Sequence, residues 1–356
     1  MRIFTAGETH RTMDTVNLKQ LAKELNLAIS TVSRALSDSH EVSSETRERV
    51  RALAKKLGFQ PNPHASSLRQ NKSKTIAVVI PEIENHFFSQ VLNGVEAIAQ
   101  EKKYHVLIYL THEDYNREKS IVQLLRNGRV DGLMISVSNS TTDFEHLEAC
   151  REAGIPLVLF DRIDEKIDVP KIITDDAAIS YKATEHLIKN GCRRIAFLSM
   201  SDSLSISNGR QSGYIKALEK YGLGKQKQVV QCSPDDKQNE QQIRKLLQQP
   251  QPPDGIFASI EKFAVNIYEI CQELHISIPQ QIKVIGFSNL PAARLLSPPL
   301  SAIVQPAYEI GKESAAILFK IIEKKALLHN EKRIVLPSML IERQSSRMSE
   351  SGVVSR

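Results

Sequence analysis

The sequence predicts an α/β protein in which an all-α helix-turn-helix headpiece precedes a two-lobed core of doubly wound parallel sheets. Apolar residues near the N-terminus recur at helical spacing around a short turn. From Ile76 onward, short apolar runs alternate with longer amphipathic segments, which is the pattern of strands and helices in parallel sheets. The length of 356 residues exceeds what one hydrophobic core usually organises, so more than one folding unit is expected.

The headpiece pattern consists of three short apolar stripes. The first two stripes flank a turn at residues 26–28, and the third begins after the capping residues Ser43 and Ser44 and ends at Gly58. The stripes contain Leu18, Leu21, Ala22 and Leu25, then Val32, Ala35 and Leu36, then Val50, Leu53 and Leu57. This order predicts helix, tight turn, helix and a third supporting helix.

The second helix of such a unit lies in the major groove of DNA, so its unburied side chains meet bases and phosphates. Arg34 is suited to bidentate contact with guanine, whereas Thr31 and Ser33 are short donors for phosphates. The predicted reading residues are Ile29, Ser30, Thr31, Ser33 and Arg34. Helix spacing alone leaves open an ordinary three-helix packing unit.

Charge is concentrated in the same region. Residues 16–74 contain 11 Lys and Arg against 5 Asp and Glu, a net charge of +6. The whole chain also has a net charge of +6 and residues 1–15 are neutral, so residues 75–356 are formally neutral. A small basic region attached to a neutral remainder is what phosphate neutralisation requires, although a solvated basic face has the same composition.

Several function classes find no support in the sequence. There is no apolar run of 18 residues, and the first residues lack a signal-peptide pattern, so a cytoplasmic, nucleoid-associated protein without membrane contact is expected. The cysteines, Cys150, Cys192, Cys232 and Cys271, are too far apart for a zinc site and are expected as buried reduced thiols. Asp175 and Asp176 lack further metal ligands. No nucleophile elbow or phosphate-binding loop occurs, so neither a cofactor nor an enzyme is predicted.

Seven apolar runs mark strands of the core. They are Ile76–Ile80, Val106–Leu110, Gly132–Ser136, Leu157–Phe160, Ile195–Met200, Ile256–Ile260 and Val284–Phe287. The full pattern suggests about ten strands, too many for one small sheet, so two lobes are expected.

Polar and aromatic residues follow several of these strands, where open parallel sheets bind ligands. A carboxylate, an arginine and an aromatic face suit a polyhydroxyl compound, because hydroxyls need both donors and acceptors. Each residue taken singly also suits a structural role, as a cap or a core residue. The candidate effector-binding residues are Asn85, Phe87, Phe88, Asp161, Arg210, Ser288 and Asn289.

The chain resembles the LacI/GalR family of bacterial transcription regulators in several motifs that occur in order. These are the runs 27–36, 42–50, 58–62 and 65–69, and the similarity continues from Lys74 to about Arg343. The resemblance implies a core similar to periplasmic sugar-binding proteins, with the ligand between two lobes and chain crossings near Thr174, Val304 and Lys332.

The implied domains are an N-terminal extension (1–15), a headpiece (16–60), a hinge linker (61–74), an effector-binding and dimerisation core (75–345) and a polar tail (346–356). Within the core, the N-lobe is expected at about 75–173 and 305–332 and the C-lobe at about 174–304 and 333–345. The tail lacks an apolar heptad, so no tetramerising coiled coil is expected.

The resemblance also implies that the hinge becomes helical on operator DNA and that Leu68 wedges into the minor groove. Asn17, Leu18 and Asn62 are the further candidates for DNA contact. Two residues depart from the family pattern: Ala28 replaces a helix-capping serine, and Ser66 replaces a common arginine. The lost cap should cost about 1 kcal/mol of local stability.

The implied protein is a homodimeric regulator, expected to be a repressor, that binds a near-palindromic operator under control of a sugar-like effector. A dimer is expected because one short helix reads too few base pairs for useful specificity. Ser288, Ile260-Glu261, Ala307 and His86 depart from residues common in sugar-responsive relatives. These departures predict fewer hydrogen-bonding groups on the C-lobe. The alternative is a catabolite-control-type regulator whose co-effector is a protein.

Overall fold

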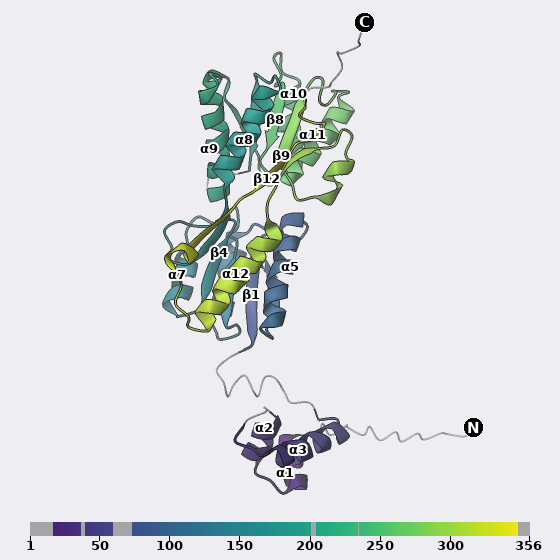
Figure 1. Cartoon of the computed structure of the whole chain (residues 1–356). Coiled ribbons are helices and arrows are strands. Elements are labelled where there is room, and N and C mark those ends of the chain that lie inside the picture. Colours follow the sequence, from purple (N-terminus) through teal and green to yellow (C-terminus); the bar gives the residue numbers. More distant parts are fainter. Residues whose placement is uncertain (1–16, 37–39, 60–72, 201–203, 234, 348–356) are drawn as a thin grey trace, which may run out of the picture. The chain divides into compact units, whose positions relative to one another are not determined.

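The structure is a computed structural model that describes residues 17–36, 40–59, 73–200, 204–233 and 235–347 (Figure 1). The chain divides into two compact units, residues 1–73 and 74–356. The first unit contains the helix-turn-helix headpiece, and the second contains both lobes of the core. Each unit is described by itself.

The headpiece consists of three helices around a small apolar core. They are α1 (Leu18–Leu25), α2 (Ile29–Leu36) and α3 (Ser44–Lys56). Asn26 ends α1 in the left-handed conformation, with φ of 52°, which lets the chain turn sharply into α2. The Ser43 hydroxyl accepts a hydrogen bond from the Thr46 amide at 3.3 Å and caps α3 as the sequence predicts. The buried core residues are Leu21, Ala22, Val32, Ala35, Val42, Val50 and Ala54.

The N-lobe of the core is built on a six-stranded, all-parallel sheet in the order β11-β5-β4-β3-β1-β2. Its strands are β1 (Thr75–Ile80), β2 (His105–Leu110), β3 (Gly132–Ile135), β4 (Leu157–Phe160), β5 (Lys171–Thr174) and β11 (Arg333–Leu336). Helices α5 (His86–Glu101) and α12 (Ala307–Ile322) pack in the cluster on one face of the sheet. Helices α6 (Tyr115–Leu125) and α7 (Glu145–Glu152) contribute to the cluster on the other face.

The C-lobe repeats this arrangement in the order β12-β10-β9-β8-β6-β7, with β12 antiparallel to β10. Its strands are β6 (Ile195–Ser199), β7 (Gln228–Gln231), β8 (Gly255–Ala258), β9 (Lys283–Phe287), β10 (Ser301–Val304) and β12 (Met339–Ile341). Helices α8 (Asp176–Lys189) and α9 (Ser205–Lys220) cover one face, and α10 (Asp236–Leu247) and α11 (Glu261–Glu273) cover the other. Short 3₁₀ turns span Gly224–Gln226, Pro291–Leu295 and His329–Glu331.

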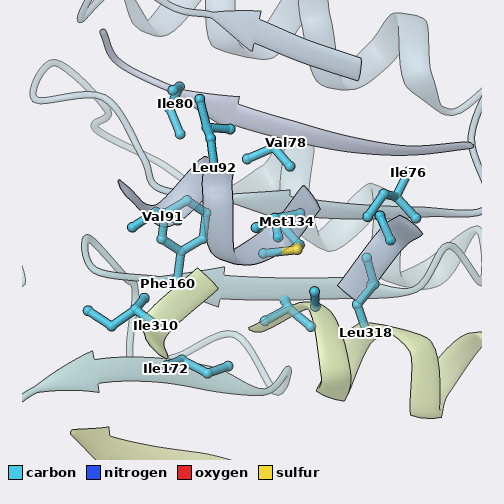
Figure 2. Packing of buried hydrophobic residues seen from close by; sticks show 14 of the residues in the cluster. Ile76, Val78, Ile80, Val91, Leu92, Met134, Phe160, Ile172, Ile310 and Leu318 are labelled. Carbon is cyan, nitrogen blue, oxygen red and sulfur yellow. The ribbon is translucent and has the colours of Figure 1, made fainter. Parts of the chain in front are cut away.

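The N-lobe core shows why the strands read as unbroken apolar runs. Val78 and Phe160 come from neighbouring parts of the sheet and pack with Val91 of α5 and Ile310 of α12 (Figure 2). Helices cover both faces of this parallel sheet, so the apolar side chains of its central strands are buried on either face. The predicted α/β fold class with two parallel-rich lobes is confirmed.

Helices α5 and α12 approach each other closely at two glycines. A Cβ atom on Gly94 would lie 2.1 Å from the Tyr308 carbonyl oxygen, and one on Gly311 would lie 2.0 Å from that of Val91. Neither position has room for a side chain. This contact attaches α12 to the N-lobe although its sequence follows the C-lobe strand β10.

One predicted crossing between the lobes is misplaced. Strand β11 pairs in parallel with β5, with Arg333 opposite Lys171, so it belongs to the N-lobe sheet. The third crossing therefore follows Leu336 rather than Lys332, because β12 is the first later strand in the C-lobe sheet. The first two crossings follow β5 and β10, which end at Thr174 and Val304.

Hydrogen bonds join the three crossings. The Gln305 amide donates to the Thr174 hydroxyl at 3.2 Å, and the Ser338 backbone N–H donates to the Asp175 carboxylate at 2.7 Å. Asp175, at the first crossing, therefore has a structural partner at the third crossing. The carboxylates of Asp175 and Asp176 have different partners, Ser338 and Arg210, so each acid has a structural role of its own.

The four cysteines are buried, as predicted, and burial raises their pKa values to between about 11 and about 12. Within the described residues, no cluster of His, Cys, Asp or Glu has the arrangement of a metal site. A search of the same residues finds no helix that is both long and apolar enough to cross a membrane.

Candidate DNA-reading surface and effector pocket

Helix α2 turns one apolar face inward and a mixed face outward. Val32 and Ala35 are fully buried in the headpiece core, whereas Ser30 and Arg34 are exposed and Ile29 remains 43% exposed. Thr31 and Ser33 are half-buried. The five predicted reading residues therefore lie together on the part of α2 that the core leaves uncovered, which is the geometry that groove contact requires.

Arg34 makes an ion pair at the surface of the free headpiece. Its Nε lies 3.2 Å from Oε2 of Glu41, and the two side chains are 57% and 63% exposed. Exposed pairs of this kind contribute about 0–1 kcal/mol, so Glu41 holds Arg34 only weakly.

Asn17 and Leu18 have clear structural roles at the start of α1. The Asn17 side chain accepts a hydrogen bond from the Gln20 amide at 3.0 Å, and the Gln20 side chain accepts one from the Asn17 amide at 2.9 Å. This reciprocal pair is a capping box. Leu18 packs against the headpiece core. Asn62 and Leu68 lie outside the described residues, so their predicted DNA contacts stay predictions.

All seven predicted effector residues line one pocket of the core. Its empty volume is about 390 Å³, part of it open to solvent. The wall comes from both lobes and consists of Asn85, Phe87, Phe88, Asp161, Arg162, Ile206, Arg210, Glu261, Phe287, Ser288, Asn289 and Gln305. The start of α5 and the loops after β1 and β4 supply the N-lobe wall. Helix α9, the start of α11, the end of β9 and the loops after β9 and β10 supply the C-lobe wall.

The N-terminus of α5 forms the apolar part of the N-lobe wall. Asn85 caps this helix, since its side-chain oxygen accepts a hydrogen bond from the Phe87 amide at 2.9 Å. Phe87 and Phe88 pack edge to face with ring centroids 5.2 Å apart, and both belong to the N-lobe core cluster. The rings therefore present a fixed aromatic surface to the pocket while most of each ring is buried.

Asp161 and Arg162 form the charged part of the same wall. Asp161 is buried and has a φ of 58°, a backbone conformation that is rare for a residue with a side chain. Burial raises the pKa of its carboxyl to about 6, although Arg162 and Arg210 oppose this shift. The Ser136 hydroxyl donates to Asp161 at 3.4 Å.

Arg162 forms an ion pair with Glu113. Its Nη1 donates to both carboxylate oxygens of Glu113 at 2.8 Å. Its Nε is buried without a hydrogen-bond partner and lies 3.9 Å from Oδ2 of Asp161. A buried N–H without a partner costs about 1–3 kcal/mol, so this donor favours an acceptor supplied by a ligand or a water.

Arg210 on α9 dominates the C-lobe wall. Its Nε donates to the Asp176 carboxylate at 2.8 Å, and its Nη1 donates to the Ser259 carbonyl at 2.6 Å. The guanidinium carbon lies 3.7 Å from the centroid of the Phe287 ring, a stacked arrangement typical of arginine. Burial raises the pKa of Asp176, and the Arg210 charge opposes that shift.

Ser288 and Asn289 line the pocket with side chains that are already bonded. The Ser288 hydroxyl donates to Oε2 of Glu261 at 2.6 Å. The Asn289 amide nitrogen donates to Gln90 on α5 at 3.0 Å and to the Gln305 carbonyl at 2.8 Å. Asn289 therefore links the C-lobe to the N-lobe beside the pocket.

Sequence reasoning missed several residues of the site. Arg162 stands next to Asp161, and Phe287 directly precedes Ser288, so chain position was a usable signal for both. Gln305 follows β10 directly, the same signal as for Asn85. Glu261 was seen only as a departure from a common residue pair. Glu261 places a carboxylate in this wall, and the expectation of fewer hydrogen-bonding groups on the C-lobe than in sugar-responsive relatives stays a prediction.

The pocket offers both donors and acceptors beside aromatic surfaces. Arginine N–H groups can donate, Asp161 and Glu261 can accept, and Phe87 supplies an apolar face. A helix-turn-helix headpiece with an exposed polar face, joined in one chain to a two-lobed core with such a pocket, defines a DNA-binding regulator that responds to a ligand.

Comparison with known proteins identifies the family. The family of periplasmic binding proteins and sugar binding domains of the LacI family matches residues 73–344, and the lacI family of bacterial regulatory proteins matches residues 17–62. The chain therefore belongs to the LacI family of bacterial regulatory proteins. It is a DNA-binding transcriptional regulator and not an enzyme.

Individual relatives are similar over almost their whole length. The chain is 31% identical to the ribose operon repressor of Haemophilus influenzae over 92% of this chain and 98% of that protein. It is 27% identical to catabolite control protein A of Priestia megaterium over 93% and 99%.

Solved structures agree with this fold. The lac repressor dimer bound to operator and the anti-inducer ONPF matches with a TM-score of 0.82 and 22% identity, covering 94% of this chain and 100% of that one. A LacI family regulator from Enterococcus faecium with bound ribose matches with a TM-score of 0.67 and 26% identity, covering 77% and 98%.

Proposed function

We propose that this regulator is a cytoplasmic repressor whose affinity for operator DNA is controlled by a sugar-like effector bound between the two lobes of the core. The observation that carries the proposal is the pocket itself, where residues from separate segments of both lobes meet around one space. The proposed ligand residues are Asn85, Phe87, Phe88, Asp161, Arg210, Ser288 and Asn289, and Arg162 and Glu261 join them.

The proposed mechanism couples the pocket to the hinge linker, residues 61–74. Three crossings connect the lobes, and direct hydrogen bonds such as Asn289 to Gln90 span them beside the pocket. A ligand that contacts both walls binds one arrangement of the lobes more tightly than another, so it shifts the population of lobe arrangements. Operator affinity then changes by the same coupling free energy.

For DNA, we propose a homodimer that places two α2 helices on a near-palindromic operator. One α2 exposes a single short reading face, which covers too few base pairs for useful specificity. The exposed or half-buried residues Ile29, Ser30, Thr31, Ser33 and Arg34 are the proposed contacts, and Asn17, Leu18, Asn62 and Leu68 complete the set. The lac repressor structure, a dimer on its operator, has the same fold.

A protein co-effector is the competing proposal, and the observations favour it less. A catabolite control protein is among the relatives, but ribose operon repressors are at least as similar in identity. The polar and aromatic walls of the pocket are what a small hydroxylated ligand requires.

The test is a thermal-unfolding screen of the full chain against neutral sugars, sugar phosphates, uronic acids and nucleosides. A ligand at 100 times its Kd should stabilise the folded state by about 2.7 kcal/mol, which raises Tm. The hit should also change affinity for an operator selected from random duplexes, by roughly 5- to 150-fold. Absence of any hit, or a hit that leaves operator affinity unchanged, would overturn the proposal.

A further inference from the structure

We propose that the pocket selects an uncharged polyhydroxyl ligand against the phosphorylated or carboxylated forms of the same compound, and that Glu261 is the residue that sets this preference. The inference rests on the proposed function and names the chemical class of its effector.

The two arginines of the pocket have their charges balanced before a ligand arrives. Arg162 contacts both oxygens of Glu113 at 2.8 Å, with side chains 5% and 25% exposed. Arg210 contacts Asp176 at 2.8 Å, with side chains 4% and 10% exposed. An anionic ligand that took a guanidinium group from its acid would leave a desolvated carboxylate without that counter-charge, so the exchange is unfavourable.

Two further carboxylates line the pocket beyond these pairs. Asp161 and Glu261 bring the acids around the pocket to four, together with Glu113 and Asp176, against the two guanidinium groups of Arg162 and Arg210. Burial raises the pKa of Asp161 to about 6, and the charges of Arg162 and Arg210 oppose this shift. A phosphate or carboxylate on the ligand would add a like charge to this excess.

Glu261 is positioned to act on a ligand directly. Its Oε2 accepts hydrogen bonds from the Ser288 hydroxyl at 2.6 Å and from the Leu290 backbone N–H at 2.8 Å. These two bonds fix the carboxylate in the pocket wall. Among the described residues, no hydrogen bond reaches Oε1 and no Lys or Arg forms an ion pair with Glu261. Oε1 is therefore free to accept a bond from a ligand donor.

A hydroxyl group matches both kinds of unused group in the pocket. One ligand hydroxyl can donate to Oε1 of Glu261, and another can accept from the Nε–H of Arg162, which makes no hydrogen bond and lies 3.9 Å from Oδ2 of Asp161. A phosphate at pH 7 has acceptor oxygens and would face Glu261 without a proton to offer. The same wall that binds a neutral sugar therefore repels its anionic derivative.

The experiment compares matched ligand pairs on the full chain by isothermal titration calorimetry. The pairs are D-ribose with D-ribose 5-phosphate and D-glucose with D-glucuronic acid. We expect the neutral member of the pair that binds to have a Kd at least tenfold lower than its anionic form. In the Glu261→Gln variant, which keeps the size of the side chain, this ratio should fall at least tenfold.

Two variants separate the role of the charge from a loss of folding. Glu269→Gln removes an exposed carboxylate from the same helix, α11, and should leave the ratio unchanged. Ser288→Ala removes a bond that holds Glu261 but keeps its charge, so it should weaken neutral binding and retain the discrimination. Equal Tm values for Glu261→Gln and Glu269→Gln would show that the core is intact.

The outcomes separate this inference from the proposed function. If the wild type binds the anionic form as tightly as the neutral form, the inference is wrong although the pocket is an effector site. An unchanged ratio in Glu261→Gln would equally overturn the role of that residue. If the wild type binds no member of the wider screen, the proposed function fails and the inference fails with it.

Discussion

The headpiece and the core use charged side chains in opposite ways. Arg34 on α2 is 57% exposed and meets Glu41 in a surface pair, whereas Arg162 and Arg210 in the core are almost completely buried against acids. DNA supplies its own negative charge, so a reading surface needs no internal counter-charge. A pocket for a small ligand removes water from its charges, so the protein must compensate them itself.

The two regions also differ in how far apart along the sequence the ion-paired residues lie. Arg34 and Glu41 are seven residues apart, but Arg162 pairs with Glu113 and Arg210 pairs with Asp176 across other elements of the fold. The pocket therefore depends on the complete core, whereas the Arg34–Glu41 pair lies within the three-helix headpiece. Substitutions in the two regions should differ accordingly.

The largest effect is expected from Arg210→Met, which leaves Asp176 buried without its partner. We expect the free energy of unfolding of the core to fall by about 3–5 kcal/mol, measured by urea denaturation of the full chain. The matched control is Arg244→Met, which removes an exposed pair with Glu273 and should cost about 0–1 kcal/mol. Equal losses in the two variants would mean that burial does not distinguish these pairs.

The second prediction concerns pH. The pKa of Asp161 is raised from 3.8 to about 6 in the folded state, so the folded state holds this proton more tightly than the unfolded state. Its contribution to stability is present below about pH 4 and is lost as pH rises through about 6, by up to about 3 kcal/mol. The Asp161→Asn variant has no carboxyl group at this position, so it should not lose this stability as pH rises.

The measurement is the unfolding free energy of wild type and Asp161→Asn at pH 5 and pH 7. The variant should gain stability relative to wild type between the two values, because groups common to both proteins cancel in the comparison. Parallel pH curves for the two proteins would contradict the raised pKa.

The smallest effect on stability, and a clear effect on recognition, is expected from Arg34→Ala. Affinity for a selected operator should fall by about 1–3 kcal/mol and affinity for random DNA by less, measured by fluorescence anisotropy at one fixed salt concentration. Stability should change by no more than about 0.5 kcal/mol, because the side chain is exposed. Lys56→Ala, an exposed charge on α3, should affect both DNAs equally and slightly. Equal losses for Arg34→Ala would make it a phosphate contact.

Much of the fold could be predicted because its signals are local. The seven strands expected from apolar runs are present to within two residues, and Ser43 and Gly58 flank α3 as expected. Strands such as β7 and β11 were missed because they lie at or near sheet edges and carry polar residues, which weakens the apolar run. The third crossing was misplaced because the family resemblance put it near Lys332, whereas β11 pairs with β5 in the N-lobe sheet.

Part of the site could be predicted, because residues that directly follow parallel strands lie close to one another. Asp161 and Ser288 follow β4 and β9, and the carboxyl ends of parallel strands meet at one edge of each sheet. Glu261 begins α11 and bonds Ser288 across 27 positions of sequence, a contact that no local pattern indicates. The bond between Asn289 and Gln90, which are 199 positions apart, was equally impossible to predict from local pattern.

By itself, the sequence determined the family resemblance that gives the class of this protein, the polar face of α2 and the residues that end the principal strands, because ordered motifs, periodicity and capping lie within short segments. Tertiary structure alone decided which acid compensates each arginine, which wall Glu261 joins and which sheet β11 extends. Those features depend on contacts between distant segments, and such contacts exist only once both sheets and their covering helices have packed.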